Sequence, residues 1–238
     1  MDYHIHDTPD EVIRDLAEFF VADAKAALQT KDRYSVSLSG GSSPKKLYEL
    51  LAADYRDHLQ WDKLYFFFGD ERNVPHTSSD SNFLMAKTAL FEPLEIHPLH
   101  VFAVDTQLEP EAAAADYART ITHYFKNGPV QFDFMLLGLG DNSHTASLFP
   151  HTPILDDQES SVKAVWLEDQ QVYRISMTAP MINDSRQTAF LLYGKGKAEA
   201  VREVIKGEPN VPQHPAQLIK PVNGQLHWFM DKEAASDL

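Results

Sequence analysis

The sequence predicts an α/β fold in which a mainly parallel sheet carries helices on both faces, a Rossmann-like three-layer arrangement, within one domain over residues 1–238. Short apolar runs that favour β-strands alternate with segments whose apolar residues recur at helical spacing. The run FDFMLL at 132–137 is too short for a helix and suits a strand buried on both faces. Most of the ten glycines directly follow predicted strands, at Gly40, Gly41, Gly69, Gly138, Gly140, Gly194 and Gly196.

The elements follow from these patterns in chain order. A helix is expected over 9–29, because Pro9 lies near its start and acidic side chains occupy its first turn. An N-terminal strand carrying His4 and His6 on one face precedes it. Further strands are expected at 34–39, 64–68, 132–137, 162–167, 173–177, 187–193 and near 225–230. Further helices are expected at about 44–53, near 80–91, at 109–126, at 197–206 and, as a short acidic helix, at the C-terminus.

Composition narrows the classes of function. The formal net charge is −14 at pH 7, which argues against nucleic acid or an anionic membrane as the main partner, since either usually requires a basic face. No stretch approaches the ~20 apolar residues of a membrane helix and no secretory leader is visible, so we expect a cytoplasmic protein. The absence of cysteine rules out disulfides, thiolate chemistry and Cys-type zinc sites.

The turn SGGSSPKKLY, 39–48, is the first candidate anion site. We expect Ser43 to cap a helix whose first residue is Pro44, which leaves the N–H groups of Gly41 and Ser42 free to face a ligand. The turn has neither the GxxxxGK[ST] nor the GxGxxG spacing, so neither ATP nor NAD is indicated.

Two further turns bring charged side chains to the carboxyl ends of the predicted parallel strands. Asp70, Glu71 and Arg72 follow the 64–68 strand together, and a surface ion cluster is the alternative interpretation. Lys197 is expected in the first turn of the 197–206 helix, where a cation opposes the helix dipole unless an anion is bound there.

The turn GLGDNSHTASLFP, 138–150, carries the candidate base. Because Asn142 and Ser143 are good helix caps, His144 is expected near the N-terminus of a short helix that ends before Pro150. The helix dipole there would lower the pKa of the imidazole and keep it neutral, as a general base must be. A metal role is less favoured, since no other histidine lies at the spacing of a zinc site.

Together these motifs resemble the 6-phosphogluconolactonases, which share a fold with the glucosamine-6-phosphate isomerase/deaminases. The resemblance covers SGGSSPKKLY, FFFGDERNVPHTSSDSN and GLGDNSHTASLFP, and continues through RISMTAPMIN and GKGKA to HWFMD. It implies hydrolysis of 6-phospho-D-glucono-1,5-lactone, a phosphorylated sugar lactone, in the oxidative pentose phosphate pathway, without metal or organic cofactor.

The resemblance also implies the roles of particular residues. His144 becomes the base that activates water, with Asp70 as a second candidate catalytic residue. The residues that fall where relatives hold phosphate and sugar oxygens are Gly40, Gly41, Ser42, Arg72, Arg174 and Lys197. Arg174 enters only through the similarity of RISMT to the corresponding stretch of the family.

The sequence departs from the lactonase pattern at residues 141–143 and from the isomerase/deaminase pattern at Asn142 and Phe149. The lactonases usually read GxGPDGHTASLFP, so Asp141, Asn142 and Ser143 replace Pro, Asp and Gly. Either Asp141 takes the role of the family aspartate by a small shift of the loop, or a carboxylate is dispensable for a lactone and Asn142 can hold His144; we favour the second. The isomerase/deaminases carry an aspartate and a glutamate where this chain has Asn142 and Phe149. An isomerase or deaminase, or a sugar-phosphate sensor without catalysis, stays an alternative.

Overall fold

The computed structural model describes residues 1–126 and 128–238. Its strands are β1 (Asp2–His6), β2 (Tyr34–Leu38), β3 (Leu64–Phe68), β4 (Asp70–Arg72), β5 (Phe134–Leu137), β6 (Val162–Leu167), β7 (Val172–Met177), β8 (Gln187–Leu192) and β9 (Gln225–Asp231). Its α-helices are α1 (Pro9–Ala27), α2 (Ser42–Asp54), α3 (Asn82–Ala86), α4 (Pro110–Tyr124), α5 (Ala179–Asn183) and α6 (Ala198–Ile205).

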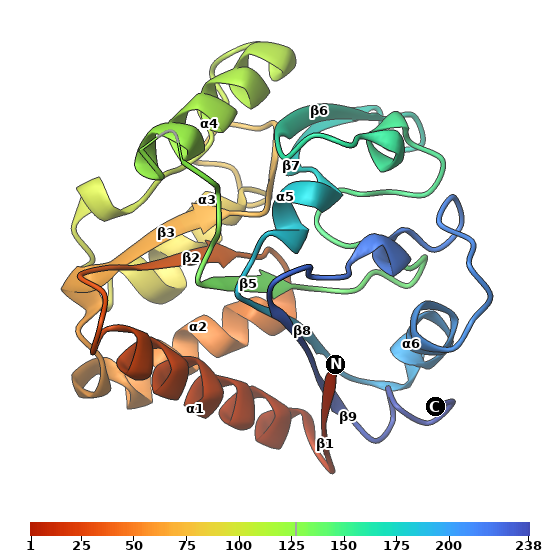
Figure 1. The fold of residues 1–238 in the computed structure, drawn as a ribbon, viewed down its shortest axis with the longest axis horizontal. Helices are drawn as coiled ribbons and strands as arrows, with labels where there is room; N and C mark the ends of the chain where they lie inside the picture. The colour runs from red at the N-terminus through yellow and green to blue at the C-terminus, as the bar shows by residue number, and fades with distance from the viewer. Residues whose placement is uncertain (127) are drawn as a thin grey trace.

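The main sheet is parallel throughout, as predicted, with strand order β1-β9-β8-β5-β2-β3. Successive residues of β5 enter different cores: Phe134 and Leu136 pack with α1 and α2, whereas Met135 and Leu137 pack with α4, α5 and α6 (Figure 1). This alternation is the period-two pattern of a strand, and both of its sides are apolar because helices cover both faces. The predicted α/β class is therefore confirmed.

A second, antiparallel sheet with the order β4-β7-β6 corrects one part of the prediction. The predicted strands at 162–167 and 173–177 pair with each other and with β4, and they do not join the main sheet. The chain passes from β3 into β4 at Gly69, whose N–H donates to Leu38 O and whose carbonyl accepts from Met177 N. This crossing carries Asp70 and Arg72 over the carboxyl ends of the parallel strands.

The helix boundaries follow local capping chemistry. α1 begins with a capping box in which Thr8 and Glu11 satisfy each other's backbone N–H groups. The predicted acidic C-terminal helix is wrong, since residues 232–237 form turns. There the Asp231 carboxylate accepts the N–H of Ala234 and that of Gly194, so it ties the terminal turns to the main sheet. Among the described residues, no helix is both long and apolar enough to cross a membrane.

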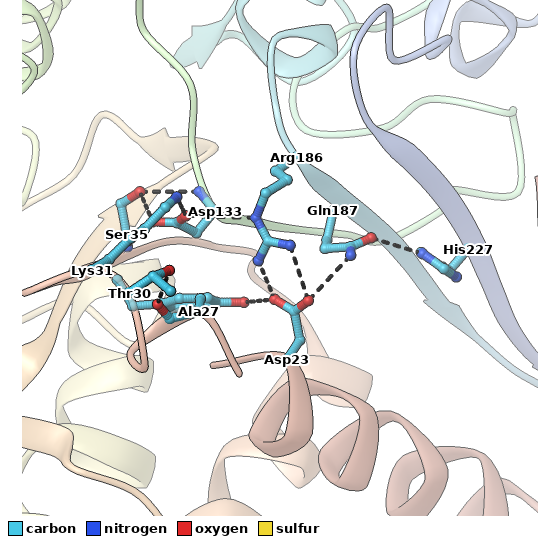
Figure 2. A network of polar contacts seen from close by, with 10 residues as sticks. Asp23, Ala27, Thr30, Lys31, Ser35, Asp133, Arg186, Gln187 and His227 are labelled. Carbon is cyan, nitrogen blue, oxygen red and sulfur yellow. Dashed lines mark hydrogen bonds and ion pairs between the residues drawn. The ribbon is translucent and has the colours of Figure 1, made fainter. Parts of the chain in front are cut away.

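Charged side chains at the amino ends of the parallel strands form a network of their own (Figure 2). Asp133 accepts the backbone N–H of Ser35 at 2.9 Å and its hydroxyl at 3.0 Å, and Lys31 pairs with the same carboxylate. Arg186 donates to Asp23, which also accepts from Tyr34. Because these partners come from different strands, the network fixes their register at the edge opposite the glycine turns.

Candidate active site

A cavity of about 330 Å³ lies at the carboxyl ends of the parallel strands. Six of the predicted site residues line it: Gly40, Gly41, Asp70, Arg72, His144 and Arg174. They come from the turn after β2, from β4, from the turn after β5 and from β7. Parallel strands bring their carboxyl ends to one edge, which is why turns far apart in sequence meet here.

The first turn approaches the cavity closely because it lacks side chains. Gly41 precedes α2 with φ +104°, a conformation that favours glycine. A Cβ at Gly40 would lie 2.0 Å from the side-chain oxygen of Asn82, so the backbone could not pack there with any other residue. The expected helix start is corrected: α2 begins at Ser42, two residues before Pro44, and no side chain caps it.

His144 lies in a turn, and the predicted short helix is wrong. Residues 141–150 form turns with an isolated bridge between Thr145 and Leu148, so the expected dipole of a helix beginning near His144 is not present. Burial is the largest cause of the lowered pKa of His144; Lys197 and Arg174 lower it further, while the charge of Asp70 raises it. The expected direction holds, for a different physical reason.

Three contacts hold the imidazole. Its Nδ1 lies 2.5 Å from Oδ1 of Asn142, and its face stacks on Phe149 with ring centroids 4.0 Å apart and planes at 16°. A Cβ on Gly140 would lie 2.1 Å from Nδ1. The glycine therefore admits the ring, the phenylalanine covers one face and the asparagine fixes its rotation.

The three charged residues of FGDER do not form a surface ion cluster. The Asp70 carboxylate is largely buried, lines the cavity and accepts the Ser147 hydroxyl at 2.6 Å. Glu71 is buried and accepts the backbone N–H groups of Asn82 and Phe83, each at 2.8 Å, which caps α3. Burial is the main cause of the raised pKa of the Glu71 carboxyl.

Arg72 and Arg174 occupy directly opposite positions on the antiparallel strands β4 and β7. Both line the cavity. Burial, and next the neighbouring charge of Arg72, lower the pKa of Arg174. Like charges in opposite positions destabilise a sheet, and within the described residues neither guanidinium forms an ion pair with a carboxylate. A bound anion would remove this repulsion.

Lys197 and Ser42 do not line the cavity. Lys197 ends a 3₁₀ turn, Lys195–Lys197, and is the N-cap of α6, so its expected place in the first helical turn is corrected. Its ammonium lies 2.5 Å from the Asp141 carboxylate. Asp141 is therefore engaged with Lys197, and Asn142 is the residue in contact with His144.

Some lining residues were not singled out from the sequence. Asn82, Ser147 and Gln170 line the cavity; the first two fall inside the motifs that carry the family resemblance, whereas Gln170 lies in the β6–β7 hairpin and has no sequence signal. Among residues 1–126 and 128–238, no group of three or more metal-binding side chains is placed to hold an ion.

Comparison with known proteins places this arrangement in a family. The family model for glucosamine-6-phosphate isomerases/6-phosphogluconolactonase matches residues 7–228. The chain is 38% identical over 216 residues to the 6-phosphogluconolactonase of Nostoc sp., covering 89% of this chain and 88% of that one. It is also 38% identical over 221 residues to the 6-phosphogluconolactonase of Synechocystis sp., with the same coverage. Its structure superposes on the 6-phosphogluconolactonase from Trypanosoma cruzi with a TM-score of 0.88 at 28% identity, covering 100% of this chain and 96% of that one. The chain belongs to the glucosamine-6-phosphate isomerase/6-phosphogluconolactonase family.

Proposed function

We propose that this protein hydrolyses 6-phospho-D-glucono-1,5-lactone to 6-phosphogluconate, with His144 as the base that activates water. The observation that carries the proposal is the placement of an oriented imidazole in the same cavity as the cation pair Arg72 and Arg174. A base beside an anion site suits an ester substrate that carries a phosphate. The product places the protein in the oxidative pentose phosphate pathway, and the cytoplasm is its proposed compartment.

The contact with Asn142 supports the role of His144 as base. Oδ1 of Asn142 also accepts the backbone N–H of His144 at 3.3 Å. Because a backbone N–H can only donate, the amide of Asn142 must direct its oxygen, not its nitrogen, toward His144. Nδ1 therefore carries the proton, and Nε2 has a free electron pair. That is the nitrogen available to water.

The cation pair supports a phosphate subsite. Arg72 donates to the carbonyl of Asp80 and Arg174 to Oε1 of Gln170 at 3.0 Å, and both retain further N–H groups. The exposed backbone of Gly40 and Gly41 and the first turn of α2 add dipoles that favour an anion. Binding the phosphate here would position the lactone carbonyl toward His144.

In the proposed reaction, His144 takes one proton from water and returns it to the substrate. Nε2 of His144 takes a proton from water as the water oxygen bonds to C1, and negative charge develops on the former carbonyl oxygen. As the C1–ring oxygen bond breaks, the imidazolium returns the proton to the departing ring oxygen. Asp70 stabilises the imidazolium through its charge. The N–H groups of Gly140 and Ser143 already donate to carbonyls of the turn, so the oxyanion would require other donors of this edge.

The alternatives differ in the carboxylates that they require. Ring opening by an isomerase or deaminase uses a glutamate where this chain has Phe149, and Phe149 stacks on His144 as an apolar surface. A sugar-phosphate sensor would need the cavity but no oriented base. Phe149 therefore favours the lactonase over the isomerase or deaminase, and the contact between Asn142 and His144 favours it over the sensor.

Turnover of freshly prepared lactone, followed above its spontaneous hydrolysis, tests the proposal. We expect saturable hydrolysis of the phosphorylated lactone and much weaker hydrolysis of glucono-1,5-lactone. Release of ammonia from glucosamine 6-phosphate would indicate the deaminase. Thermal stabilisation by 6-phosphogluconate without turnover would indicate the sensor.

A further inference from the structure

The residue before His144 has an unusual backbone. Ser143 is buried and has φ +62°, a left-handed conformation that costs a non-glycine residue free energy. Ala146 and His151, in the same turn, also have positive φ. Turns of this kind persist only where their surroundings hold them.

A distant segment, residues 210–218, holds this turn at both ends. Oγ of Ser143 lies 3.1 Å from Nδ1 of His214, and the carbonyl of Ser143 accepts the N–H of Ala216 at 3.0 Å. At the other end of the turn, the N–H of His151 donates to the carbonyl of Pro212 at 3.1 Å. The turn that carries His144 is therefore anchored by residues about seventy positions later in the chain.

His214 is itself fixed on its other side. Its Nε2 lies 3.8 Å from the Glu203 carboxylate, which also binds Arg202. Its backbone N–H donates to Asn210 at 2.8 Å, and the short 3₁₀ turn Pro215–Leu218 follows it directly. Glu203, His214 and Ser143 form a chain of contacts that ends at the residue preceding His144.

This chain is not a nucleophilic triad. The Ser143 side chain is buried and does not line the cavity, so no substrate carbonyl could reach its oxygen. Its only neighbour in the chain of contacts is Nδ1 of His214. The contacts instead determine the backbone angles from which the His144 side chain projects.

We propose that His214 is a positioning residue for His144: its bond to Ser143 holds the left-handed backbone that aims the imidazole at the substrate carbonyl. This inference rests on the proposed function, because it assumes that His144 is the base. Since the phosphate subsite is built from β4, β7 and the turn after β2, loss of His214 should lower kcat and leave KM for the phosphorylated lactone unchanged. A base displaced by about 1 Å can lose up to about a hundredfold in rate, so we expect a fall of roughly ten- to a hundredfold in His214→Ala.

Three variants of the full chain separate positioning from general structure. His214→Asn places an amide near the position of Nδ1, His214→Gln places it near Nε2, and His214→Ala removes both. We expect His214→Asn to retain most of kcat and the other two to lose it, with thermal unfolding showing that all are folded. His123→Asn, on the exposed side of α4, is the control for loss of a histidine. Wild-type kcat in His214→Ala, or a rise in KM alone, would overturn the inference.

Ser143→Gly tests whether the effect passes through Ser143. Glycine adopts the left-handed conformation without a side-chain anchor, so His214→Ala should add little to the effect of Ser143→Gly. A full additional loss of kcat in the double variant would show that His214 acts by another route. If His144→Ala abolished turnover while His214→Ala did not change it, this inference alone would fail; turnover retained in His144→Ala would instead remove the proposed base.

The ¹⁵N chemical shifts of the His144 ring give a readout that does not depend on turnover. In the wild type we expect the tautomer with the proton on Nδ1, and in His214→Ala a mixture of tautomers, because the contact with Asn142 is disturbed. An unchanged spectrum in a folded His214→Ala protein would contradict the inference.

Discussion

Nδ1 of His144 lies 2.5 Å from the side-chain oxygen of Asn142. An asparagine thus stands in the place where the family pattern has an aspartate, and its oxygen can still accept a hydrogen bond from Nδ1 of the proposed base. It does so without a negative charge, so it cannot stabilise the imidazolium by charge as a carboxylate does. Two carboxylates raise the pKa of His144 by their charge, and the effect of Asp70 is larger than that of Asp141.

Removing the side chain of Asn142 should therefore lower kcat and leave KM for the phosphorylated lactone nearly unchanged. In Asn142→Ala the ring of His144 can rotate and either nitrogen can hold the proton, so we expect kcat to fall about tenfold or more with little change in KM. Steady-state kinetics on the phosphorylated lactone measure this. Asn142→Asp, which keeps the acceptor, should retain kcat at high pH. Equal losses in both variants would refute an orienting role.

His144→Ala should lose about a hundredfold or more in kcat, because general base catalysis contributes about 10²–10⁴. The variant should stay folded, as judged by circular dichroism and thermal unfolding, since the cavity only loses a side chain at its surface. The control is His123→Ala, which removes an exposed histidine of α4 that does not line the cavity. Near-unchanged turnover in His144→Ala would remove it as the base.

The pH dependence should show a base with a lowered pKa. Activity requires neutral His144, and burial lowers its pKa, so the decline of kcat/KM at low pH should have its midpoint below about 6.5, the ordinary value of a histidine. Asn142→Asp adds a negative charge and should move this decline to higher pH. A substrate phosphate also titrates at about pH 6. The pH profile of kcat/KM should therefore be repeated with glucono-1,5-lactone, which carries no phosphate. A decline centred above the ordinary value in the wild type would contradict the burial argument.

The cation pair should determine affinity for the phosphate. Charge-assisted hydrogen bonds contribute about 1.5–3 kcal/mol, so Arg174→Gln should raise KM for the phosphorylated lactone about tenfold or more and change KM for glucono-1,5-lactone little. Lys197→Gln should have a smaller effect, because its ammonium pairs with Asp141 outside the cavity. Equal effects of Arg174→Gln on both lactones would place the arginine outside the phosphate subsite.

The network of Asp133, Ser35 and Lys31, at the amino ends of the parallel strands, should affect the stability of the protein and not its activity. Asp133→Ala leaves the buried N–H of Ser35 without an acceptor and removes the partner of Lys31, so we expect the free energy of unfolding to fall by about 2–4 kcal/mol. Urea unfolding measures this, and kcat and KM of the folded protein should not change. Asp133→Asn keeps one acceptor oxygen and should lose less. A kinetic defect in a stable Asp133→Ala protein would mean that the two edges are coupled.

Features that depend on residues close together in the chain could be predicted from the sequence. The start of α1 near Pro9, the buried strand FDFMLL and the glycine turns after β2, β3 and β5 follow from local periodicity and turn chemistry. Their meeting at one edge follows as well, because parallel strands align their carboxyl ends. The convergence of Gly40, Asp70 and His144 was therefore predictable.

The arrangement of side chains in the candidate site depends on tertiary contacts, because these contacts join residues far apart in the chain. Arg174 lies opposite Arg72 through an antiparallel pairing across about a hundred residues, for which the sequence carries no local signal. Packing around a helix-free turn lowers the pKa of His144 by burial, whereas the sequence pointed to a helix dipole. The same packing brings Asp141 to Lys197 and Asn142 to His144. Periodicity and turn propensity do not distinguish between these two neighbouring residues.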